Sequence, residues 1–266
     1  MKQEDAPQGA ILVEGPDGNL PAVTVEERIP STLFVFPLRE SVAFPNLMMP
    51  VLLDTEHARE IVVKAEQSRY LFMLTQKDPT LEHPQPKDFY EVGVVAKILK
   101  TLRLPDGNSS VMVQGIHRAR IARVVRTDPF FVAKVVESPE IPTKGKRVQA
   151  LHRKLQQSLT EVASMNDSLG TDFSTAVLNI DRPEQLADFT GAYFLKQTDQ
   201  RQKILETLEI GPRVEAALEY VLGELELQRL GNRIQKEIRE KVEKAQKDYF
   251  LREQLKIIRR ELGEET

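Results

Sequence analysis

The chain contains no cysteine and no tryptophan, and only four of its 266 residues are histidine. Without thiols it can form neither a disulfide nor a thiolate metal site, and this usage fits a reducing compartment. No apolar run approaches the roughly 18 residues that a membrane span requires. The N-terminus also lacks an apolar signal segment, so we expect a cytoplasmic protein without a membrane anchor.

Common catalytic signatures are missing as well. Gly145-Lys146 is the one Gly-Lys pair, and it lacks the earlier glycine and the following hydroxyl of a phosphate-binding loop. Neither Gly-x-Ser-x-Gly nor His-Glu-x-x-His occurs. We therefore expect no catalytic residue, no metal site and no cofactor in this chain. A site assembled only by folding would escape this search. A hydrolase without a recognisable motif therefore stays one hypothesis for this chain.

The charge balance gives little attraction to polyanions. Lys and Arg number 37 against 40 Asp and Glu, a net charge of −3, which predicts no general affinity for nucleic acid or membranes. One basic stretch, residues 97–126, could contact phosphates, and Arg118 and Arg120 would share a strand face there. It has no interleaved aromatic residues for base stacking. A solvated sheet face is the favoured interpretation, and nucleic-acid binding is not expected.

Residues 1–30 are rich in proline, glycine and acidic residues, a composition that predicts a flexible acidic tail. Residues 31–140 are mainly β in pattern, with one amphipathic helix over 56–67 that Asp54 or Thr55 would cap. Pro105-Asp106-Gly107-Asn108 predicts a hairpin turn. We expect a small, nearly closed β structure from the following strands: 33–38, 48–53, 70–74, 92–104, 110–116, 118–126 and 130–136.

Residues 141–224 are helical in pattern, and such short helices predict a packed bundle. Apolar residues at helical spacing indicate one helix over 148–162. Further helices would start at Asp181, as a cap, and at Thr198, with Gly211-Pro212 ending the latter. A fourth would run from Arg213 to Leu222. The fold class is therefore α+β: a β domain with one helix, then an all-α bundle.

Residues 225–266 predict one long, charged helix with two apolar stripes. The first stripe comprises Leu227, Leu230, Ile234, Ile238, Val242, Ala245 and Tyr249. The second comprises Leu251, Leu255, Ile258 and Leu262, roughly on the opposite side at 100° per residue. We expect the first to pack against the bundle or another helix. The second, with Tyr249, would contact a missing domain or a second subunit. A simple amphipathic helix with a gentle bend is the alternative.

One apolar cluster is a candidate for binding unfolded chains. Residues 44–50 crowd Phe44, Leu47, Met48 and Met49 between prolines, and methionine suits surfaces that accept many apolar shapes. Core packing is the alternative, and it is favoured for Met49. Exposure of the cluster beside Phe130 and Phe131 would create a patch able to bind unfolded protein.

A series of short motifs follows one another in order along the chain: Phe36-Pro37-Leu38-Arg39, Phe44-Pro45, Pro50, Gln76-Lys77-Asp78, Tyr90-Glu91-Val92-Gly93, Leu104-Pro105-Asp106-Gly107, Val113-Gln114-Gly115 with Arg118, Lys203-Ile204-Leu205-Glu206, Tyr249 to Lys256, and Glu261-Leu262-Gly263. These motifs resemble those of the N-terminal region of the ATP-dependent Lon protease, over about residues 30–264. The departures are small: Asn46 stands where glycine is usual, and Gln114 where glutamate is frequent.

The resemblance implies a PUA-like β pseudo-barrel that recognises substrates, truncated before the ATPase module. Its partners would be unfolded, damaged or tagged proteins, and the parent would be a homohexamer of the AAA+ class. ATP, Mg²⁺ and a Ser-Lys catalytic dyad would belong to the parent protein beyond residue 266. The alternative is a stand-alone protein-binding adaptor of the same fold. The sequence disfavours it, since a complete protein rarely finishes on an apolar stripe that awaits a partner.

Overall fold

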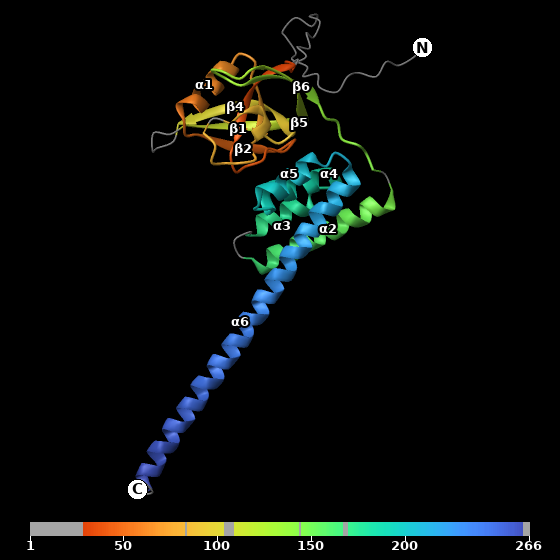
Figure 1. Ribbon diagram of the computed structural model, residues 1–266. Helices are drawn as coiled ribbons and strands as arrows, with labels where there is room; N and C mark the ends of the chain where they lie inside the picture. The colour runs from red at the N-terminus through yellow and green to blue at the C-terminus, as the bar shows by residue number, and fades with distance from the viewer. Residues whose placement is uncertain (1–28, 83, 104–108, 144, 167–169, 263–266) are drawn as a thin grey trace, which may run out of the picture.

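The computed structural model describes residues 29–82, 84–103, 109–143, 145–166 and 170–262. A β-rich part sits above a helical part, and one helix projects away from both (Figure 1). The predicted acidic tail lies outside the described residues up to position 28, and the predicted turn at 105–108 lies outside them entirely. Among the described helices, none combines the length and the apolar character needed to cross a bilayer.

The β part is a ring of five strands with a sixth attached to its rim. The strand order is β2-β5-β4-β3-β1-β6, and β6 pairs back onto β5 to close the ring. β1 and β3 run parallel, and the other pairs are antiparallel. This arrangement confirms the predicted α+β class and the nearly closed β structure. The strands are β1 (Thr32–Leu38), β2 (Met48–Leu53), β3 (Tyr70–Thr75), β4 (Val92–Arg103), β5 (Ser109–Arg126) and β6 (Val132–Glu137).

Helix α1 (Glu56–Ala65) follows β2, and a 3₁₀ turn, η1 (Pro86–Asp88), precedes β4. The Thr55 hydroxyl accepts a hydrogen bond from the Ala58 N–H at 3.1 Å, so Thr55 is the N-cap among the two predicted candidates. Ala58, Ile61, Val62 and Ala65 form the buried face of α1. That face packs on β1, β2 and β3, as the helical spacing predicted.

Two predicted strands, 110–116 and 118–126, are in fact the single strand β5. The sequence suggests a break at His117, but His117 lies in the ladder opposite Val95 of β4. Beyond this point β5 gains β6 as a partner, with register shifts between Ile121 and Arg126. The inward and outward positions therefore change along β5, and a single alternating pattern cannot describe it.

The helical part contains α2 (Lys146–Met165), α3 (Gly170–Leu178), α4 (Pro183–Phe189), the π-helical turn η2 (Thr190–Phe194), α5 (Thr198–Glu206) and α6 (Ile210–Glu261). Helix α3 was not predicted. Helix α4 starts where expected, but Arg182 rather than Asp181 occupies its N-cap position, and no side chain caps it. Similarly, Gln197 is the N-cap of α5 and Thr198 is its first residue.

Helix α6 joins two predicted helices into one of 52 residues. Gly211 and Pro212 lie in its first turn rather than ending a helix, a position that tolerates proline because the first N–H groups need no intrahelical partner. Gly223 and Gly231 are interior, each at a cost of about 1 kcal/mol, among strong helix formers. The last buried residue is Leu225, so the rest of α6 projects from the bundle (Figure 1).

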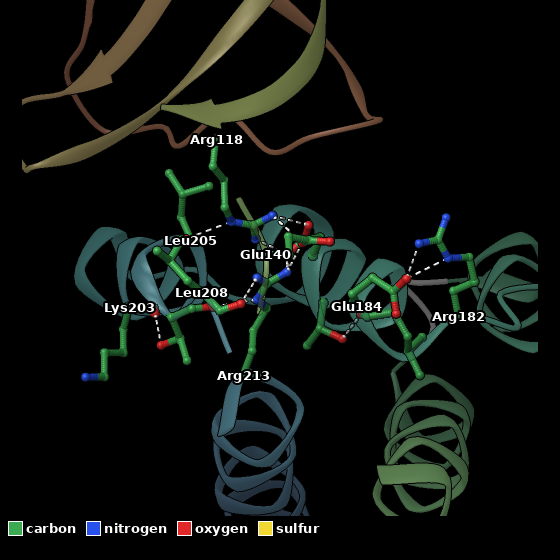
Figure 2. A network of polar contacts seen from close by, with 12 residues as sticks. Arg118, Glu140, Arg182, Glu184, Lys203, Leu205, Leu208 and Arg213 are labelled. Carbon is green, nitrogen blue, oxygen red and sulfur yellow. Dashed lines mark hydrogen bonds and ion pairs between the residues drawn. The ribbon is translucent and has the colours of Figure 1, made fainter. Parts of the chain in front are cut away.

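A buried charge network joins the β part to the helices (Figure 2). Arg118 of β5 donates to both carboxylate oxygens of Asp188 on α4, at 2.5 and 3.0 Å, and to Glu140 at 2.9 Å. Arg213 of α6 donates to the same Glu140 oxygen at 2.5 Å and lies 3.5 Å from Asp188. Arg118 is therefore not part of a solvated or phosphate-binding sheet face.

The arginines also donate to backbone carbonyl groups at the end of α5. Arg118 Nε donates to Leu205 O at 2.9 Å, and Arg213 donates to Thr207 O at 2.7 Å and Leu208 O at 3.1 Å. Burial raises the pKa of Asp188, while the guanidinium groups of Arg118 and Arg213 oppose that shift. Two cations face two carboxylates, so the loss of one carboxylate leaves a buried positive charge unbalanced.

Asp188→Asn keeps the side-chain shape but removes that charge. We expect the free energy of unfolding to fall by about 3–5 kcal/mol, the usual cost of breaking a buried pair, in urea denaturation. The control is Arg147→Gln, which breaks the exposed ion pair with Glu215 and should cost less than about 1 kcal/mol. Equal losses in the two variants would show that the buried network adds no particular stability.

Candidate functional site

Strand β2 presents an apolar outer edge to solvent. Its residues alternate between the interior and the outside: Val51 and Leu53 are buried, whereas Met48, Pro50 and Leu52 are exposed. Met48 is 58% exposed and Leu52 is 51% exposed. Such large apolar side chains in solvent are notable when they cluster, and these three share one face because strand side chains repeat every second residue.

Neighbouring strands extend this surface. Pro50 pairs with Met112 of β5, and Leu52 pairs with Ser110, which itself pairs with Leu102 of β4. Directly opposed residues project from the same side of a sheet. We call this surface the β2 face, and it comprises Met48, Pro50, Leu52, Leu102 and Met112. It contains two methionines, whose flexible thioethers adapt to irregular apolar partners.

The turn into β2 and its free edge are both specified by sequence. Asn46 has φ of 60°, a left-handed conformation that asparagine and glycine accept more readily than other residues. Pro50 has no N–H, which blunts the unpaired edge of β2 against uncontrolled strand pairing. The Tyr193 hydroxyl of η2 donates to Met48 O at 3.4 Å, so the helical part borders the β2 face at this end.

A groove of about 580 Å³ lies beside the β2 face. Its walls come from the end of β1, the second half of β2 and the start of α1. We call it the β1–β2 groove; its apolar lining includes Pro37, Leu38, Pro50, Leu52, Ala58 and Ile61. It is open between β1 and β2 because these strands do not pair with each other.

The predicted candidate residues do not form one patch. Phe44 is only 2% exposed and its ring packs against Gly191 of η2. A Cβ on Gly191 would lie 2.5 Å from Phe44 Cζ, so glycine is required for this close approach. Leu47 and Met49 are half-buried against the same core. Only Met48 of this group lies freely at the surface.

Phe130 and Phe131 lie elsewhere. Phe130 is 5% exposed and contacts Phe34 edge-on at 6.2 Å and His57 in a stack at 5.1 Å. Phe131 is half-buried against Phe89, with ring centroids 5.7 Å apart. Sequence reasoning missed Leu52, Leu102 and Met112. The alternation within β2 could have indicated Leu52, but the other two required the strand register.

The projecting part of α6 carries both apolar stripes in solvent. The assembly candidates Tyr249, Leu251, Leu255, Ile258 and Leu262 are each between 49% and 69% exposed. The first stripe, expected to pack against the bundle or another helix, is also exposed from Leu227 onward. Packing of this stripe against the bundle is therefore wrong, because the buried residues of α6 end at Leu225, and Arg229 beyond it forms an exposed ion pair with Glu161 of α2. Packing against another helix stays a prediction.

No group of three or more His, Cys, Asp or Glu side chains suited to a metal ion occurs within the described ranges. The candidate site consists of an apolar face, a groove and a projecting helix.

Comparison with known families identifies the domain that carries this surface. The family model for the ATP-dependent protease La (LON) substrate-binding domain matches residues 32–222, which include the whole ring, the bundle and the start of α6. The chain belongs to this Lon family. The β2 face and the β1–β2 groove both lie within the matched region.

Curated relatives agree. The chain is 34% identical over 236 residues to the Lon protease of Dictyoglomus thermophilum, covering 89% of this chain and 30% of that protein. It is 35% identical over 240 residues to the Lon protease of Desulfovibrio desulfuricans, covering 90% and 27%. The chain thus spans less than a third of the length of these Lon proteases, and neither an ATPase nor a peptidase domain lies within it.

Solved structures share the fold. The N-terminal domain of Mycobacterium avium complex Lon protease superposes with a TM-score of 0.60 at 23% identity, covering 71% of this chain and 97% of that one. A Lon N-terminal domain protein from Xanthomonas campestris gives 0.52 at 15% identity, covering 71% and 98%. At these identities the likeness concerns the fold alone.

Burial separates Phe44 from Met48 in this Lon domain, although the two are close in sequence. Phe44→Ala should lower the free energy of unfolding by about 3–5 kcal/mol, because it leaves a cavity between the ring of β-strands and the helical bundle. Met48→Ala should change it by less than about 0.5 kcal/mol, as exposed positions do. Chemical denaturation of the two variants checks this, and similar losses would contradict the assigned burial.

Proposed function

We propose that this chain is the substrate-recognition region of an ATP-dependent Lon protease, and that the β2 face binds apolar segments of unfolded, damaged or tagged proteins. The match to the Lon substrate-binding domain supports a protein substrate. The observation that supports this surface is the exposure of Met48 and Leu52, which project from the same face of the rim strand on either side of Pro50. Native proteins bury the segments that would fit there, whereas unfolded ones expose them.

Burial of a few apolar side chains favours weak binding that tolerates many different sequences. Covering an apolar side chain gains about 1.5–3 kcal/mol when burial is complete, and the β2 face offers a few half-exposed side chains. Binding would then be reversible and insensitive to the detailed sequence. In the proposed division of labour, this chain selects segments in the cytoplasm, and ATP-driven unfolding and Ser-Lys cleavage occur in other domains of a homohexameric protease.

The exposed end of α6 supports a second role, in assembly. Apolar side chains on the second stripe would gain burial against another Lon domain or a second copy of the chain. We assign this role to Tyr249, Leu251, Leu255, Ile258 and Leu262. These side chains are each between 49% and 69% exposed, and they follow one another at short intervals along the far end of α6.

Met48→Asp with Leu52→Asp tests the β2 face. The double variant should bind a chemically unfolded protein about tenfold more weakly than the wild type, because two charges replace partly buried apolar contacts. Fluorescence anisotropy with a labelled, permanently unfolded protein measures the affinity. The same protein in its native fold should bind poorly to both.

The matched control is Val63→Asp, an equally exposed apolar residue on the outer side of α1. It should bind the unfolded protein as the wild type does. Unchanged binding by the double variant, or an equal loss in the control, would rule out the β2 face as the binding surface.

Replacement of Leu255, Ile258 and Leu262 by glutamine tests assembly. Self-association, followed by sedimentation velocity over a concentration series, should weaken. The melting temperature should shift by no more than about 2 °C because exposed positions contribute little to folding. Identical sedimentation of variant and wild type would refute a role for the second stripe in self-association.

A further inference from the structure

The β1–β2 groove is lined by several hydrogen-bond acceptors, beside Arg39, Ser41, Thr55 and His57, which can donate. Gln76 is 2% exposed and lines the groove. Its Nε2 donates to Leu81 O at 3.4 Å, but its Oε1 has no hydrogen-bond partner. A buried acceptor without a donor is unfavourable, and an entering donor would relieve it.

The strand edges on either side of the groove add carbonyl groups. Leu47 O accepts from Gly115 of β5, whereas Met48 O accepts from Tyr193 on the other side. Alternation along β2 then directs the carbonyl of Pro50 away from β5. On β1, Leu38 O accepts from Gln76 beyond the end of β3, so the carbonyl of Pro37 points away from β3. Neither proline has an N–H, so at these two positions the lips of the groove present acceptors only.

Carboxylates complete the lining. Glu40, Asp54 and Glu82 line the groove, and Arg39 is its one lysine or arginine. Within the described part of the chain, none of the three carboxylates forms an ion pair. The groove therefore combines excess negative charge, one buried acceptor without a partner in Gln76, and partly apolar walls. A long cationic side chain fits such a site, since its methylene groups cover apolar surface while its head donates hydrogen bonds.

We propose that the β1–β2 groove binds a lysine or arginine side chain of an unfolded segment whose apolar neighbours lie on the β2 face. This inference rests on the function proposed above and adds a preference to it: segments that combine basic and apolar residues bind, and segments that combine acidic and apolar residues are disfavoured. Two prolines at the lips limit strand pairing, so side-chain charge rather than backbone pairing provides the selection.

The test uses three short unstructured peptides with identical apolar positions. At two fixed positions they carry lysine, glutamine or glutamate, and their ends are acetylated and amidated so that side chains are the one source of charge. The full chain should bind the lysine peptide about threefold to tenfold more tightly than the glutamine peptide, as partly exposed ion pairs allow. The glutamate peptide should bind more weakly than both.

The groove variant is Glu40→Gln with Asp54→Asn and Glu82→Gln. It should bind the lysine and glutamine peptides equally, while its affinity for the glutamine peptide stays at the wild-type level. The matched control, Glu237→Gln with Asp248→Asn and Glu253→Gln, changes net charge equally on the distant α6 and should keep the preference. Loss of the preference in the control, or its persistence in the groove variant, would overturn the proposal.

A second measurement does not depend on the folding of the triple variants. Because the chain has no cysteine, Leu52→Cys carries a single photocrosslinker at the groove lip. Crosslinks should map next to the lysine positions of the basic peptide. Equal binding of all three peptides by the wild type would overturn the charge preference alone, whereas failure to bind any of them would overturn the proposed function itself.

Discussion

The architecture depends on the buried pairing of two arginines with two carboxylates at the junction of the ring and the bundle. Arg118 comes from the strand that borders β2, and Arg213 comes from the first turn of the long helix. Because Asp188 and Glu140 bind both cations, the ring, the linker, α4 and α6 share one site. Phe44, seated on Gly191, adds a packed contact beside it. The β2 face is therefore held in a defined orientation relative to α6.

The surface chemistry of the ring is concentrated at its rim strand and at the adjacent groove. The ring uses closure to remove most strand edges and leaves β2 on the rim, where proline replaces a donor. An edge that can neither pair freely nor hide its side chains is suited to transient apolar contacts. Pro50 of β2 and Pro37 of β1 leave only backbone acceptors at the lips of the adjacent groove. The carboxylates of the groove supply negative charge. Selection of a segment would then depend on side-chain composition, which suits the proposed binding of many different unfolded chains.

Local periodicity predicted the elements well where one pattern matches one environment. The α1 face and the body of α2 followed from helical spacing, and β3 followed from its continuous apolar run. Prediction failed where tertiary partners change along an element. Strand β5 exchanges neighbours near His117, and α6 passes from a packed bundle into solvent at Leu225. Composition could not separate the buried from the exposed residues in the cluster at 44–50. Phe44 is buried because its ring packs against Gly191, which is distant in sequence. Met48 is exposed because it lies on the outer face of β2. Arg118, read as a surface charge, finds its partners 22 and 70 residues away.

The projecting part of α6 also sets a length scale. From Glu226 to Glu261 the helix extends about 54 Å at 1.5 Å per residue, without a kink-forming proline. The projecting helix sets a minimum length for any chain that runs beside it. An extended polypeptide covers at most about 3.4 Å per residue, so a tether anchored where α6 leaves the bundle needs roughly sixteen unstructured residues to reach the far tip. A tether anchored on the ring needs more, because the bundle lies between the ring and the projecting part of α6 (Figure 1).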